Sequence, residues 1–98
     1  MYIFKSSGNY IGFVANNNLF SRDGVYLGWI ENNLAWDSRG NFKGQLFEIN
    51  GQHYVLRNTF MIPPISRIPK VRPIPPIPPI PPINVQPITL KIGFADSL

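Results

Sequence analysis

Apolar and polar positions follow two different patterns along the chain, and the change falls near residue 61. In the first part, aromatic residues and glycines recur every 16 positions. The recurring sets are Phe4, Phe20 and Trp36, then Gly8, Gly24 and Gly40, then Tyr10, Tyr26 and Phe42, and finally Gly12, Gly28 and Gly44. A unit this short cannot bury its own apolar face, so we expect the units to share one core.

Each unit reads as two short strands separated by turns. In the second unit, Asp23-Gly24 and Asn32-Asn33 supply residues that tolerate the left-handed backbone of tight turns. Between them, residues 26–30 are rich in the aromatic and branched residues that are typical of strands. Turn signals about every eight residues leave no room for a helix. The pattern predicts an all-β fold, a small barrel of repeated hairpins, since closure removes exposed strand edges.

The second pattern is a stripe of prolines and aliphatic residues with a period of three. We assign residues 1–61 to the barrel, 62–83 to this stripe, and 84–98 to a closing strand and tail. The aliphatic positions of the stripe are Ile62, Ile65, Ile68, Val71, Ile74, Ile77, Ile80 and Ile83. A polyproline II helix has three residues per turn. The stripe is therefore expected to be a polyproline II segment with one continuous apolar edge.

Two uses of this edge follow from the sequence. The strands of the barrel are apolar on both faces, so the aliphatic edge is expected to cover the outer face, either of its own barrel or of a sister chain. At about 3.1 Å per residue the stripe would span roughly 68 Å, so part of it must curve or project. The other use is as a ligand for an SH3-like groove, because Lys70-x-x-Pro73-x-x-Pro76 and Arg72-x-x-Pro75-x-x-Pro78 both fit the basic PxxP pattern.

Residues beyond the stripe carry one more strand signal. Residues 88–92 (Ile-Thr-Leu-Lys-Ile) alternate apolar and polar positions, which is typical of a strand. We expect this strand to pair with residues 1–5 and so to close the barrel. Residues 93–98 are then a short tail.

The charge of the chain is concentrated in its second part. The formal net charge is +4, and residues 62–98 contribute +3 of it, from Arg67, Lys70, Arg72 and Lys91 against Asp96. Arg67, Lys70 and Arg72 form a candidate basic patch. No aromatic residues alternate with these cations, so nucleic acid is not an expected partner. The N-terminus shows no signal peptide and no apolar run is long enough to span a membrane, so we expect a cytoplasmic protein without a transmembrane segment.

Residues that carry chemistry are few and scattered. His53 is the only histidine and there is no cysteine, so the sequence offers no metal-ligand spacing. Asp23 and Asp37 lie beside turns, where aspartate supports the backbone. No nucleophile–base pair or phosphate loop is present. We therefore expect no catalytic residue, no metal, no cofactor and no enzymatic activity.

Several runs together resemble a known family. They are residues 9–13 (Asn-Tyr-Ile-Gly-Phe), 19–30, 36–46 and 93–96 (Gly-Phe-Ala-Asp). With the repeated Asp-Gly-x-Tyr-x-Gly-Trp pattern and the proline-rich stripe, they resemble the four-fold beta-flower family of small bacterial proteins. The resemblance implies a shallow barrel whose hairpins splay like petals in pseudo-four-fold order. It extends to tubby-like barrels, some of which bind lipid. The fourth unit, beginning at His53, lacks the Gly-x-Tyr-x-Gly core, and the family brings no functional residue with it.

Two classes of function remain open besides the SH3-like ligand. The first is a non-enzymatic interaction or assembly module, with a homo-oligomer as its product. Its candidate contact residues are Phe13, Trp29, Trp36, Ile74, Ile77, Ile80 and Ile83. The second is a carrier of a lipid or small apolar ligand, which would use the barrel mouth and the shallow places at Gly12, Gly28 and Gly44. Such mid-strand glycines typically mark a bend, a bulge or the close approach of another backbone.

Overall fold

The hydrophobic pattern forms strands where it was expected to in the first part of the chain. The computed structural model describes residues 1–98 and contains eight strands and no helix. The strands are β1 (Tyr2–Phe4), β2 (Tyr10–Ala15), β3 (Asn18–Ser21), β4 (Tyr26–Glu31), β5 (Leu34–Asp37), β6 (Phe42–Ile49), β7 (Gln52–Asn58) and β8 (Phe94–Asp96). At the predicted Asn-Asn turn, Asn32 and Asn33 have φ angles of 52° and 61°. The molecule has no helix long and apolar enough to cross a membrane.

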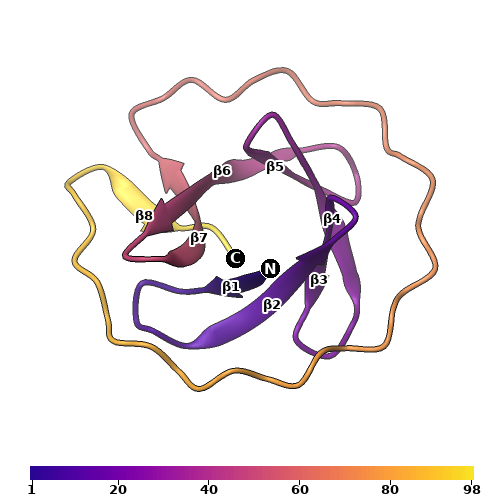
Figure 1. Cartoon of the computed structure of the whole chain (residues 1–98). Coiled ribbons are helices and arrows are strands. Elements are labelled where there is room, and N and C mark those ends of the chain that lie inside the picture. The colour runs from indigo at the N-terminus through magenta and orange to yellow at the C-terminus, as the bar shows by residue number, and fades with distance from the viewer.

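Seven of the strands close into a barrel. From β1 to β7 each strand pairs antiparallel with the next, and β1 then pairs with β7 through Ile3↔His53 and Phe4↔Tyr54. Each strand reverses the direction of the one before, so the first and the seventh point the same way and their pairing is parallel. The all-β barrel of hairpins predicted from the sequence is confirmed. It is a flat body of 36 × 35 × 17 Å, with both termini near its middle (Figure 1).

Closure does not use the strand that the sequence pattern suggested, so the pairing of residues 88–92 with residues 1–5 is wrong. Residues 88–92 form no strand, and the eighth strand is β8, which pairs with the far half of β7. The alternation in 88–92 has another cause. Ile88 and Leu90 pack against a buried cluster formed by Phe4, Tyr10, Tyr54 and Leu56, so every second side chain faces the barrel without strand pairing.

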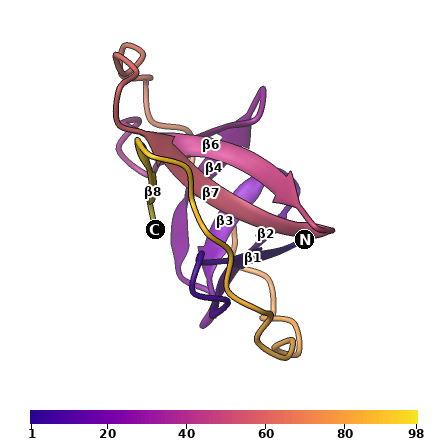
Figure 2. The ribbon, with the colours of Figure 1, turned by 90° about the vertical axis from the view of Figure 1, so that its left-hand side faces the viewer.

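The fourth hairpin of the repeat is completed from the far end of the chain. The hairpins β1–β2, β3–β4 and β5–β6 are closed by short turns, in which the amides of Lys5, Ser21 and Asp37 donate to Asn9, Val25 and Asn41. The fourth hairpin is β7–β8, and there the amide of Thr59 donates to the carbonyl of Gly93 at 2.6 Å. Residues 59–93, which include the whole stripe, are thus the enlarged turn of the fourth hairpin. Figure 2 shows this arrangement with β6 and β7 toward the viewer.

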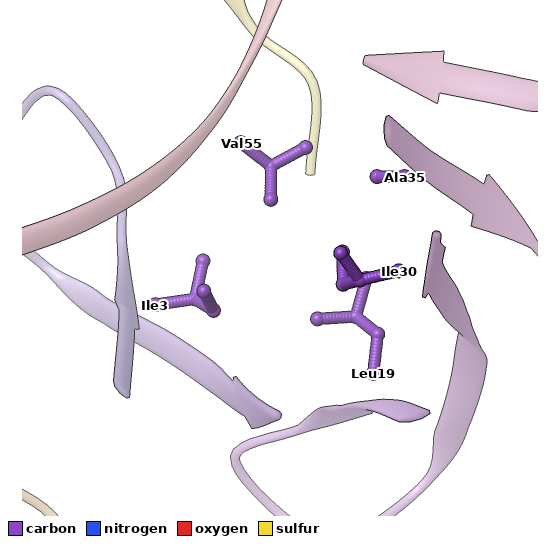
Figure 3. Close-up of a cluster of buried hydrophobic side chains, with 5 residues drawn as sticks. All are labelled: Ile3, Leu19, Ile30, Ala35 and Val55. Atoms are coloured by element: carbon purple, nitrogen blue, oxygen red, sulfur yellow. The ribbon is translucent and has the colours of Figure 1, made fainter. Parts of the chain in front are cut away.

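Apolar side chains pack in two layers around the barrel wall. The inner layer fills the barrel and consists of Ile3, Leu19, Ile30, Ala35 and Val55 (Figure 3). Leu98, the last residue, packs against this inner cluster. The outer layer is aromatic and lies on the outside of the strands. Its buried members are Phe4, Tyr10, Phe13, Phe20, Tyr26, Trp29, Trp36, Phe42 and Tyr54.

The mid-strand glycines let neighbouring hairpins approach closely. A Cβ atom at Gly12 would collide with the carbonyl oxygen of Phe20, and one at Gly28 with that of Trp36. At Gly44 the added carbon would lie 2.7 Å from the carbonyl oxygen of Leu56. The register of the hairpins shifts at the same places, next to Phe20 and Trp36. Because these glycines have no Cβ, the backbone of the next hairpin can lie against them, as the close-approach interpretation requires.

Gly12→Ala should lower the free energy of unfolding by about 2 kcal/mol or more, because the added methyl group must displace backbone rather than a flexible side chain. Urea unfolding checks this. Gly51→Asn is the matched control, since a Cβ there meets nothing within 4 Å and asparagine tolerates its positive φ. The free energy of unfolding of Gly51→Asn should fall by less than about 1 kcal/mol. Equal losses for the two variants would contradict the close-approach role.

Candidate interaction surface

The outer surface of the molecule is built by a single extended segment. Residues 62–88, called the belt below, run around the outside of the barrel from the end of β7 to the start of β8 (Figure 1). The belt passes the other three hairpins in the reverse of their sequence order, first near Gly40, then near Gly24 and last near Gly8. It hides the aromatic outer layer that the strands would otherwise expose.

The contacts between belt and hairpins recur every nine residues. The amide of Arg67 donates to the carbonyl of Gly40 at 2.7 Å, and the amide of Val85 donates to that of Gly8 at 2.9 Å. Midway between them, Pro76 and Pro78 lie against Gly24. Proline has no amide hydrogen, so this middle contact is packing alone. Each hairpin thus corresponds to nine residues of the belt, which are three turns of three residues.

The belt is extended along the outer edge of the molecule. From residue 67 to residue 85, 18 steps of an extended chain at about 3.1 Å each cover about 56 Å. Half the circumference of a disc 36 Å across is about 57 Å. The belt therefore passes from the third hairpin to the first with no slack and no excess length.

The predicted period of three is present in the burial, but the prediction that the aliphatic edge covers its own barrel is wrong, and its packing on a sister chain stays a prediction. The residues that face the barrel are in one phase, and their partly buried members are Pro64, Pro73, Pro79, Pro82, Val85 and Ile88. The aliphatic edge faces away from the barrel. It consists of Ile62, Ile65, Ile68, Val71, Ile74, Ile77, Ile80 and Ile83, with exposed fractions of 85–96%. This outward edge is called the rim below, and it includes four of the predicted contact residues.

Two cations lie in the inward phase of the belt. Arg67 Nη1 lies 2.7 Å from a carboxylate oxygen of Glu31, and Lys70 Nζ lies 3.2 Å from the other. Arg67 also stacks on Trp36 at 4.9 Å from the ring centre, and Lys70 on Trp29 at 5.3 Å. Residues 67 and 70 are in the same phase, and the rim is in another. The contacts that turn the cations inward therefore turn the isoleucines outward.

The predicted basic patch is consequently engaged within the molecule. Besides Arg67 and Lys70, Arg72 lies 5.5 Å from the centre of the Tyr26 ring. The hydrogen bond from Lys70, together with the charges of Lys70 and Arg67, holds the pKa of Glu31 below its ordinary value of 4.5. Glu31, Arg67, Lys70 and Arg72, with Trp29 and Trp36, form what we call the clasp. It fastens the belt to β4 and β5.

Three predicted contact residues are not on the surface at all. Phe13, Trp29 and Trp36 are only 4%, 1% and 1% exposed, so their assignment to a contact surface is wrong. Phe13 stacks on Phe20 at 5.2 Å, and Trp29 on Trp36 at 6.5 Å, beneath the belt. The sequence shows that the strands are apolar on both faces. It does not show that the same chain returns to cover the outer face.

Tyrosine hydroxyls lie in the same covered layer. Burial raises the pKa of Tyr10 and of Tyr26, although nearby Arg22 and Arg72 oppose the effect. Burial likewise raises the pKa of Tyr54. The phenols are therefore neutral at ordinary pH. The hydroxyl of Tyr2 donates to the carbonyl of Ile80 at 2.9 Å and gives the belt a further attachment.

Beside the inner cluster, a cleft of 330 Å³ is lined by Leu19, Leu27, Trp36, Asp37, Lys43, Ser97 and Leu98, so a ligand at the barrel mouth stays a prediction. The places at Gly12, Gly28 and Gly44 are filled by neighbouring backbone, and Leu98 packs on the core of the barrel. A second cleft, of 410 Å³ and mostly apolar, lies outside the barrel at the fourth hairpin. It is lined by Phe47, Ile49, Leu56, Thr89, Leu90, Lys91 and Phe94. This second cleft was not predicted from the sequence. The only indication of it in the sequence is that the fourth unit departs from the repeat.

Comparisons with known proteins place the chain by its sequence. The family model described as "4-fold beta flower protein" matches residues 1–90. Comparisons with curated proteins and with solved structures found no match. No three histidine, cysteine or acidic side chains lie together in a group that could hold a metal ion.

The clasp should open in acid. A carboxyl whose pKa is lowered by folding stabilises the fold above its ordinary value of 4.5, and this contribution is lost as the pH falls through the lowered pKa. Both tryptophans of the chain lie under the clasp cations. Tryptophan emission should therefore change in this pH range in the parent and not in Glu31→Gln.

Glu48→Gln is the matched control for the clasp. Glu48 pairs with His53 at 3.3 Å, away from the belt, so its loss should leave the acid change in emission intact. An acid change of the same size in the parent and in Glu31→Gln would show that Glu31 does not hold the belt.

Proposed function

The chain belongs to the 4-fold beta flower family, and we propose that this member is a non-enzymatic module that assembles with further copies of itself through the rim. The observation that carries the proposal is the exposure of the rim. Eight aliphatic side chains stand in one continuous line with 85–96% of their surface in water. Monomeric proteins rarely expose apolar patches larger than a few hundred Å².

The barrel itself does not need these side chains. The inward phase of the belt contacts the hairpins, as do Ser66, Arg72, Pro78 and Asn84 of the neighbouring phase, and the rim points away from them. Polar side chains at the rim positions would leave those contacts unchanged. Burying one isoleucine contributes about 1.5–3 kcal/mol. The rim thus holds a large unused driving force for association.

The regular spacing of the rim favours a second copy as the partner. Successive rim side chains are one three-residue step apart, which is about 9 Å in an extended chain. The gap between two of them accepts a side chain of an equal rim that is shifted by half a step. A line with constant spacing is therefore complementary to itself, as in the interdigitating faces of stacked sheets.

The curvature of the rim favours more than one neighbour. The rim is convex, and the molecule is 36 Å across, so a neighbouring disc touches only a short arc of it. A stable interface buries about 800 Å² on each partner and involves about 20–30 residues a side. One arc of a few isoleucines is smaller than that. We therefore propose an assembly in which each copy contacts several others along its edge.

The SH3-like interpretation has less support. Its pattern needs a free basic residue followed by two exposed prolines. Lys70 is paired with Glu31, and Pro73 is partly buried against the barrel. In the second motif, Pro75 and Pro78 are exposed, but Arg72 lies over the ring of Tyr26, so the basic residue of each motif is engaged within the chain.

Replacing Ile74, Ile77 and Ile80 together by serine should remove assembly without unfolding the barrel. In native mass spectrometry and light scattering, the parent should show multiples of 11.1 kDa and the triple variant a single 11.1 kDa species. Because the replaced side chains are solvent-exposed, the thermal midpoint of the isolated chain should shift by less than about 4 °C.

Ile92→Ser is the control for general stickiness, since Ile92 is 93% exposed but lies off the rim. It should keep the mass of the parent. A parent that remains at 11.1 kDa at high concentration would exclude self-assembly, whether or not it binds vesicles or other proteins. A triple variant that keeps the parent's mass would exclude the rim as the interface.

A further inference from the structure

The fourth hairpin lacks an aromatic pair that the other three contain. In those three, the residue at the register shift faces an aromatic residue of the return strand. The pairs are Phe4 with Tyr10, Phe20 with Tyr26, and Trp36 with Phe42, at ring distances of 6.0, 6.0 and 5.6 Å. In the fourth hairpin, Leu56 is paired with Asp96. Two rings are thus replaced by one aliphatic side chain and one carboxylate.

The apolar cleft lies beside this replacement. Leu56 is part of its lining, and Phe47 and Phe94 form an edge-to-face pair at 5.7 Å. Ile49 and Leu90 complete the apolar part of the lining, and Thr89 and Lys91 are its polar members. Its volume of 410 Å³ is within the range of about 300–1,000 Å³ that is common for small-ligand pockets.

We propose that this cleft binds an aliphatic carboxylate, such as a medium-chain fatty acid, with its chain between Phe47, Leu56 and Phe94 and its carboxylate toward Lys91. The apolar lining selects a chain without hydrogen-bonding groups, because such groups would lose water without gaining a partner. The site is separate from the rim and does not depend on assembly.

Charge favours an anion at the polar end of the cleft. Lys91 takes part in none of the three ion pairs of the molecule, which join His53 to Glu48 and both Arg67 and Lys70 to Glu31. The nearby carboxylate of Asp96 accepts hydrogen bonds from the amide and hydroxyl of Ser6, at 2.8 and 2.6 Å. Glu48 is already paired with His53. Lys91 is therefore the one lining charge, and it has no partner within the chain.

The test is a titration of the full-length, isotope-labelled protein with decanoate below its micelle concentration, followed by NMR. Signals of residues 47–49, 56 and 89–94 should shift together and saturate. Lys91→Gln should weaken decanoate binding about two- to fivefold, as expected for a partly exposed ion pair, and leave decanol binding unchanged. Thr89→Trp, at an exposed lining position, should fill the cleft and weaken both ligands at least tenfold.

Two controls separate the cleft from other apolar surfaces. Thr89→Ser keeps the cleft open and should bind as the parent does. The rim variant Ile74→Ser/Ile77→Ser/Ile80→Ser should also keep full affinity, so the result does not depend on whether the protein assembles. Equal binding by the parent and Thr89→Trp, shifts that centre on the rim, or binding only to acidic vesicles and not to free decanoate would each overturn the proposal.

Discussion

The hydrogen bond between Thr59 and Gly93 marks the constraint on which the rest of the structure depends, because it joins the two ends of the enlarged fourth turn. Three hairpins close with short turns, and the fourth closes only when β8 returns from the far end of the chain. Closing so long a loop has an entropic cost that grows with its length. Proline lowers this cost, since its fixed φ leaves the unfolded chain fewer conformations to lose. The composition of the belt is thus linked to the way the fourth hairpin is completed.

The belt also shows how a period of three couples the two sides of one segment. Every third residue shares an edge, so fixing one contact fixes the direction of all side chains. Arg67 and Lys70 reach Glu31 and stack on Trp36 and Trp29. These contacts and the hydrogen bonds from the amides of Arg67 and Val85 hold prolines on the aromatic wall and leave the isoleucines in water. A shift of one residue would bring another phase against the wall: the isoleucines in one direction, and in the other the phase that contains Pro75, Pro78 and Pro81.

Much of the fold was readable from the sequence because its signals are local. Asn32-Asn33 and Asp23-Gly24 define turns by their backbone preferences, and the 16-residue repeat locates β2 to β6. What failed depends on contacts between distant residues. The alternation in residues 88–92 indicates burial of every second side chain, but it cannot distinguish pairing with a strand from packing on an aromatic wall. The period of three shows which residues share an edge and not which edge faces inward. The cleft arises where Leu56 meets Asp96, a pairing with no local signal.

The belt covers one apolar surface, the aromatic layer, and exposes another, the rim. This difference bears on function. Without the belt, the aromatic layer around Tyr26, Trp29 and Phe42 would face water, since these side chains lie on the outside of the barrel wall. With it, the layer is covered, and an aliphatic rim is exposed in its place. The wall is covered by the two other phases of the belt, in which prolines, three cations and Asn84 make contacts. Polar residues in the outward phase would have completed a fully soluble surface at no loss to the fold. The isoleucines are therefore not explained by the stability of the single chain, and an explanation has to be sought in what the rim contacts.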